Sequence, residues 1–270
     1  MDKIKKYFGK IIKILSLKEL SILPAYLAYS LVLAIIPIIT IIVVILGTFN
    51  ISIDTVIRLI DDLLPNYASD VIVNAISGES FDWSVGALNI VTFVVAANGM
   101  YAIVNASNNL YKLESNSQLK DRLRSFVILV IMILLLLFMI IVPMLGDKII
   151  EIISALNISK SIIDMVHLLY EALKWPITFV LIFFAIKSIY IIAPSVKVKS
   201  DETTIGAFVT TIGWAIFTAI FGYYIAFFGR YDIIYGGLAS IIILLIWFYV
   251  ISFILILGIV INTMKYNKEH

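Results

Sequence analysis

Four asparagines near the end of one long apolar stretch are the side chains in this chain best placed to do chemistry. Asn98, Asn105 and Asn109 are spaced by seven and four residues, which puts them on one face of a helix, and Asn108 lies beside them. A polar group in hydrocarbon must find an internal partner, so such residues mark helix contacts or a functional path. The stripe therefore predicts either hydrogen bonds between helices or a polar surface facing a cavity, and both readings stay open.

Three further positions attract attention for other reasons. Lys187 is the one charged residue in an apolar stretch, and its ammonium either reaches the membrane surface or binds an anionic headgroup. Pro37 removes a backbone donor within the first apolar stretch, so we expect a kink and a candidate hinge there. Gly236 and Gly237 lie in a very short connection between the last two stretches and are candidate turn residues.

Several kinds of chemistry are excluded by composition. The chain has no cysteine, which removes disulfides, thiolate catalysis and cysteine-ligated metals. It has only two histidines, His167 and His270, so a multi-histidine metal site is not expected. No nucleophile–base pair is apparent. We therefore expect no catalytic residues, no metal and no cofactor.

The elements that must position these residues are long stretches without charge. The chain of 270 residues is 62% hydrophobic and 14% charged, against about 25% charged in an ordinary soluble domain. A bilayer-spanning helix needs about 20 mostly apolar residues. The sequence therefore predicts an all-α polytopic membrane protein with six transmembrane helices and additional short amphipathic helices. The expected spans are residues 22–47, 84–108, 125–146, 175–194, 205–229 and 236–263.

The remaining segments have amphipathic patterns. Residues 1–20 form a cytoplasmic tail whose apolar and lysine-rich faces predict a helix lying on anionic lipid. Residues 21–264 form the transmembrane domain, and residues 265–270 form a second cytoplasmic tail. Apolar residues at helical spacing around 56–76, 149–156 and 162–169 predict short amphipathic helices on the outer face or dipping between the spans.

The distribution of basic residues predicts the orientation. Alternate segments hold fourteen basic residues on one side of the membrane and five on the other. The positive-inside rule puts the richer side in the cytoplasm, so both termini are expected to be cytoplasmic, as six spans require. We expect a multi-pass protein of the bacterial cell (inner) membrane.

Short motifs recur in a specific order from about residue 20 to residue 264. They are residues 25–30 with Ile36-Pro37, residues 109–111 with Arg122 and Arg124 beyond, Gly206-Ala207, Trp214, Phe221-Gly222, residues 235–239, Trp247, Tyr249, Leu257-Gly258 and Asn262. In this order the chain resembles the YihY/virulence factor BrkB family of bacterial inner-membrane proteins, which carries an old ribonuclease BN-like label. Ala34, Gly237 and Val260 depart from its pattern, which usually has serine, serine and an acidic residue there.

The resemblance implies movement of an envelope lipid or a small solute. The alternative is a non-transporting envelope protein that organises lipids or partner proteins, because no nucleotide-binding motif and no clear ion-coupling carboxylate is apparent. Nothing in the residues supports the ribonuclease label, so we expect no enzyme. The expected partners are membrane lipids, anionic lipids among them, and not nucleic acid. Substrate, direction and oligomeric state are left open.

Overall fold

The computed structural model describes residues 18–48, 54, 57–58, 86–113, 117–155, 160–228 and 239–269. These residues are helical apart from short turns, and they include no strand. The long helices are α2 (Lys18–Thr48), α5 (Gly86–Leu110), α6 (Gln118–Ala155), α7 (Lys160–Ile192), α8 (Ser200–Phe228) and α10 (Ala239–Glu269). The all-α polytopic fold expected from the sequence is confirmed.

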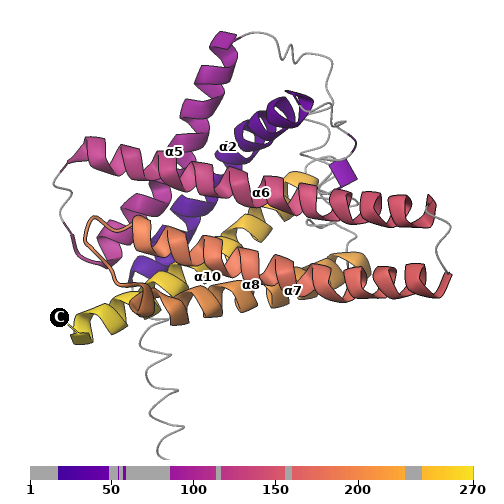
Figure 1. The fold of residues 1–270 in the computed structure, drawn as a ribbon. Helices are drawn as coiled ribbons and strands as arrows, with labels where there is room; N and C mark the ends of the chain where they lie inside the picture. Colours follow the sequence, from indigo (N-terminus) through magenta and orange to yellow (C-terminus); the bar gives the residue numbers. More distant parts are fainter. Residues whose placement is uncertain are drawn as a thin grey trace, which may run out of the picture.

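The six long helices form a closed ring of contacts. Each packs against the next along the chain, and α10 returns to pack along α2. Figure 1 shows α6, α7 and α8 running alongside one another, while α5 crosses α6 obliquely. The crossing brings the middle of α5 near the first turns of α6, which decides where the asparagines lie.

Glycines allow the closest helix contacts. A Cβ on Gly99 of α5 would lie 2.3 Å from Cβ of Ala34 in α2, so a side chain there would clash. Gly206 of α8 and Gly258 of α10 face one another, since a Cβ on Gly206 would lie 2.3 Å from the Gly258 carbonyl oxygen. Small residues of this kind let membrane helices approach closely and gain van der Waals contact.

Five of the described helices are long and apolar enough to cross a membrane: α2, α6, α7, α8 and α10. α5 is not among these five helices of the described part of the chain, so the expected span at residues 84–108 stays a prediction. α5 nevertheless supplies part of the buried core, including Met100, Ala102 and Val104. It is therefore an integral part of the bundle, and its exposed face carries asparagines as well as valines.

α6 and α7 are longer than a bilayer requires. At about 1.5 Å per residue, their 38 and 33 residues exceed the hydrocarbon thickness of about 30 Å. The segments 149–156 and 162–169 were expected to be separate short helices. Instead, the first is the end of α6, which continues to Ala155, and the second is the beginning of α7, which starts at Lys160. Their helical periodicity is confirmed, but not their separation from the spans.

Several expectations concern residues outside the described ranges. They are the amphipathic helix of the N-terminal tail up to residue 17, most of the segment 56–76, and the turn residues Gly236 and Gly237. Pro37 is described, and α2 continues as a helix through it and through Pro24. The role of Pro37 as a hinge stays a prediction, as does the assignment of residues 21–264 to one transmembrane domain.

Candidate functional site

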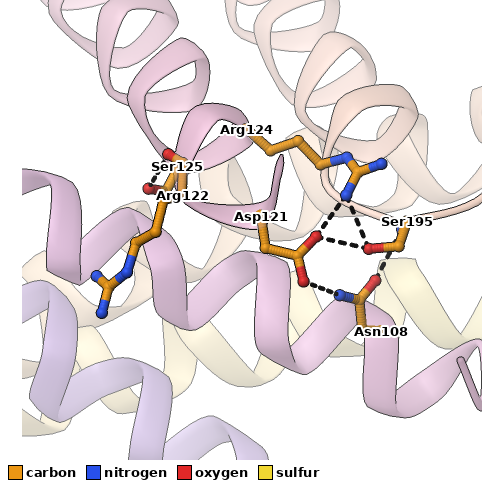
Figure 2. Close-up of polar contacts among 6 residues, drawn as sticks. All are labelled: Asn108, Asp121, Arg122, Arg124, Ser125 and Ser195. Atoms are coloured by element: carbon orange, nitrogen blue, oxygen red, sulfur yellow. Dashed lines mark hydrogen bonds and ion pairs between the residues drawn. The ribbon is translucent and has the colours of Figure 1, made fainter. Parts of the chain in front are cut away.

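A buried polar cluster joins the ends of three helices (Figure 2). It comprises Asn108 in the last turn of α5, Asp121 and Arg124 near the start of α6, and Ser195 just after α7. Asn108 donates from Nδ2 to Oδ2 of Asp121 at 3.2 Å, and its Oδ1 accepts the backbone N–H of Ser195 at 2.7 Å. We call these four residues the polar clamp.

The Asp121 carboxylate is the centre of the polar clamp. Its side chain is 1% exposed, a burial that is unfavourable for a carboxylate without strong donors. The donors are Asn108, the Ser195 hydroxyl at 2.7 Å, and the Arg124 guanidinium, which also donates to the Ser195 hydroxyl at 2.8 Å. The clamp is thus a satisfied hydrogen-bond network, and it ties α5, α6 and the α7–α8 connection together.

Local backbone structure presents these side chains to one another. The N–H of Leu113 donates to the Asn108 carbonyl and that of Lys112 to the Asn109 carbonyl, with Lys112 at a φ of 54°. This is the Schellman arrangement that ends many helices, here without the usual glycine. α7 ends at Ile192, shortly before Pro194, which has no N–H to donate, and the chain turns there so that the Ser195 N–H meets Asn108.

A second cluster joins the first turns of α6 to the middle of α5, on the outer side of the bundle. Arg122 points away from Asp121 and Arg124 (Figure 2). Its guanidinium donates to Oδ1 of Asn98 and lies 4.1 Å from the centroid of the Tyr101 ring. Both Arg122 and Asn98 are exposed. We call Arg122, Asn98 and Tyr101 the arginine cluster.

Asn98, Asn105 and Asn109 lie on the outward side of α5. Asn98 and Asn109 are exposed and Asn105 is half-buried. The apolar members of the same stripe, Val91 and Val94, are 58% and 47% exposed, so the stripe faces away from the bundle core. We call the three asparagines the outer asparagine stripe. Asn108 lies apart from them on the buried face.

The structure therefore separates the four asparagines. Asn98 and Asn108 each bond a residue of α6, as the helix-contact reading expects. Asn105 and Asn109 have no side-chain hydrogen bond to another residue in the described part of the chain. A path along the outer asparagine stripe would be open to the bilayer rather than enclosed within the bundle.

Lys187 lies in α7, half-buried, with Nζ 6.0 Å from the centroid of the Phe183 ring one turn earlier. That distance is at the outer limit of a cation–π contact. Lys187 makes no polar contact with a residue of the polar clamp or of the arginine cluster. Its assignment as a headgroup contact stays a prediction.

Other buried polar contacts were not expected from the sequence, although Gly206 and Asn262 stand among the motif residues given above. The Tyr190 hydroxyl donates to the Leu255 carbonyl at 2.8 Å and lies 2.6 Å from Oγ1 of Thr210, linking α7, α8 and α10. Asn262 accepts the Gly206 N–H at 3.0 Å. Polar residues on otherwise apolar helices are the signal that could have identified them.

Glu202 is a buried carboxylate that sequence reasoning also missed. It is 0% exposed, and its Oε2 accepts the Lys199 N–H at 2.6 Å while its own N–H donates to the Lys199 carbonyl. This reciprocal pair resembles a capping box at the start of α8. Burial, Glu202 and Tyr266 together raise the pKa of the nearby Tyr111 phenol above its ordinary value.

The fold and its exposed apolar helices define a multi-pass membrane protein. Among the described residues, no group of three or more histidine, aspartate or glutamate side chains is placed to hold a metal ion. Residues 11–270 match the family model described as virulence factor BrkB. The chain belongs to the virulence factor BrkB family.

One curated relative is the "Putative ribonuclease-like protein YfkH" of Bacillus subtilis (strain 168). It is 28% identical over 224 residues, which are 81% of this chain and 80% of that protein. No solved structure matches the chain.

Proposed function

We propose that this protein moves a lipid or a small solute across or within the bacterial cell envelope. It acts from the cell (inner) membrane, with both termini in the cytoplasm, and has no enzymatic activity of its own. The excess of basic residues at the N-terminal tail, the α5–α6 connection, the α7–α8 connection and the C-terminal tail supports this orientation.

The observation that carries the proposal is the outer asparagine stripe. A helix face that meets lipid is ordinarily apolar, because an amide in hydrocarbon loses its hydrogen bonds with water. The exposed Asn98 and Asn109, with Asn105 between them, instead offer amides along the outside of α5. Such a stripe can hydrogen-bond a passing headgroup or solute while apolar chains stay in the bilayer.

The second candidate is a non-transporting scaffold of the envelope. The polar clamp and the close approach of Gly206 to Gly258 support it, because both make the helix contacts tight and specific. The ribonuclease-like name of the relative suggests a third activity, which we do not adopt. On our proposal, the purified protein leaves labelled RNA intact under conditions in which it moves lipid.

The test is lipid movement in vesicles reconstituted with the full-length protein. A fluorescent phospholipid is placed in both leaflets, and dithionite is added outside to bleach the label that reaches the outer leaflet. We expect Asn105→Leu to slow the protein-dependent bleaching about tenfold. An increase of about 1.4 kcal/mol in the activation free energy of lipid crossing slows the rate by that factor. The melting temperature in detergent should stay unchanged, because Asn105 makes no side-chain hydrogen bond to another described residue.

Two variants serve as controls. Val95→Leu alters an exposed apolar side chain on the same helix and should leave bleaching unchanged. Asn108→Leu removes a buried contact of the polar clamp and should lower the melting temperature instead. A folded Asn105→Leu protein with full activity would remove the stripe from the transport path. Absence of lipid movement by the wild-type protein would favour the scaffold.

A further inference from the structure

Arg122 and Arg124 lie two residues apart at the start of α6 and have opposite environments. Arg124 is paired with the buried Asp121. Arg122 is exposed, and no described carboxylate forms an ion pair with it. A guanidinium carries five N–H donors and stays charged at any physiological pH. Within the described part of the chain, Arg122 therefore presents a positive charge that no carboxylate neutralises on the outer surface of the bundle.

The Arg122 side chain is held in place although it is exposed. One face of the guanidinium stacks on Tyr101 at 4.1 Å, and NH1 donates to Asn98. Both contacts come from α5, so the position of the charge depends on the packing of two helices. A planar cation fixed in this way, with donors left over, suits two oxygens of a phosphate.

The surroundings of Arg122 are apolar on the side that enters the membrane. Phe126, one turn further along α6, stacks on Phe93 of α5 with ring centroids 5.6 Å apart. Val127 and Val130 of α6 are exposed nearby, at 46% and 45%. The region Gln118–Met139, which includes Arg122, is apolar enough to lie in a membrane. The charge therefore lies at the polar end of an apolar helix surface, as a headgroup lies at the end of its acyl chains.

From this geometry we infer that the arginine cluster binds the phosphate of an anionic phospholipid, with the acyl chains along the apolar surface of α5 and α6. The orientation proposed above places the site in the cytoplasmic leaflet, where anionic lipids attract basic side chains. A fixed cation that pairs with no described carboxylate, bordered by exposed apolar side chains, matches both the charge and the amphipathic form of such a lipid. The inference deepens the proposed function by naming the lipid class, and binding can be measured without transport.

The test is binding of phosphatidylglycerol to the purified full-length protein in a neutral detergent, counted by native mass spectrometry against phosphatidylcholine. Arg122→Gln keeps much of the side-chain length and removes the charge, so we expect affinity for phosphatidylglycerol to fall about tenfold. Tyr101→Leu removes the stacking surface and should weaken binding by a smaller factor. Phosphatidylcholine carries the same phosphodiester beside a choline cation, so its binding should be weaker from the start and fall by a smaller factor in both variants.

The matched control is Lys174→Gln on α7, which removes a partly exposed cation outside the arginine cluster and should leave phosphatidylglycerol affinity unchanged. Arg122→Lys keeps the charge but loses the planar fork, and it should recover only part of the affinity. Unchanged affinity in Arg122→Gln and Tyr101→Leu would overturn the assignment. Equal competition by millimolar inorganic phosphate would also overturn it, by showing a site for free anions. Specific lipid binding without lipid movement would support the site and remove lipid movement from the proposed function.

Discussion

At the scale of single residues, Asp121 shows how a charge is tolerated inside this bundle. Its carboxylate accepts hydrogen bonds from Asn108, Ser195 and Arg124 and is almost fully buried. Removing it leaves these donors without their acceptor, which is more unfavourable than never burying them. We expect Asp121→Ala to destabilise the protein by about 2 kcal/mol, measured as a lower melting temperature in detergent.

The control for Asp121→Ala is another carboxylate in an ion pair. Glu171 pairs with Lys174 on α7 at 2.7 Å, but both side chains are partly exposed. Glu171→Ala should therefore change stability by about 0.5 kcal/mol or less. Equal melting temperatures for the two variants would contradict the clamp as a stabilising network. Asn108→Ala combined with Asp121→Ala should be less destabilising than the two single effects added together.

At the scale of helices, the contact of α8 with α10 depends on Gly258. A Cβ at this position would lie 2.2 Å from Oγ1 of Thr210 and 2.3 Å from the Tyr190 hydroxyl. Gly258→Ala must separate the helices or break the hydrogen bond between these two hydroxyls, so we expect a loss of about 1–3 kcal/mol. Gly222→Ala on α8 is the control, since a Cβ there meets nothing within 4 Å. It should be neutral or gain up to about 1 kcal/mol in helix propensity.

The Gly258→Ala and Gly222→Ala variants can be compared by thermal unfolding in the same detergent. A Gly258→Ala protein as stable as the Gly222→Ala protein would show that α8 and α10 separate at little energetic cost. That result would weaken the scaffold alternative, which depends on a tightly packed bundle. Loss of stability only in Gly258→Ala would confirm the close contact that the structure shows.

At the scale of the whole molecule, the proposed orientation can be tested by cysteine labelling, because the chain has no cysteine of its own. Ser161, Gln118 and Ser200 are all exposed at helix starts. In intact cells, an impermeant maleimide should label Ser161→Cys and not Gln118→Cys or Ser200→Cys. All three should label after permeabilisation. The opposite pattern in intact cells would reverse the orientation and move the arginine cluster to the outer leaflet.

The sequence alone determined the class of the protein. Long uncharged stretches can bury their apolar side chains and pair their backbone polar groups in few ways other than as membrane helices. It also placed Asn98, Asn105 and Asn109 on one helical face, since that depends only on the residues per turn. It did not show that α6 continues as far as Ala155 or that α7 already begins at Lys160. Amphipathic periodicity alone does not say whether neighbouring helical segments are joined.

Only the tertiary structure decided which way the faces of α5 point. Periodicity groups residues on a face but does not name its neighbours, so the outward position of the stripe and the inward position of Asn108 required the packing of α5 against α2 and α6. The different environments of Arg122 and Arg124 likewise follow from that packing, as does the burial of Asp121. Apart from the Asp121–Arg124 pair, which spans three residues, the hydrogen-bond partners lie 13 to 74 residues away along the chain, and local sequence rules do not reach across such separations.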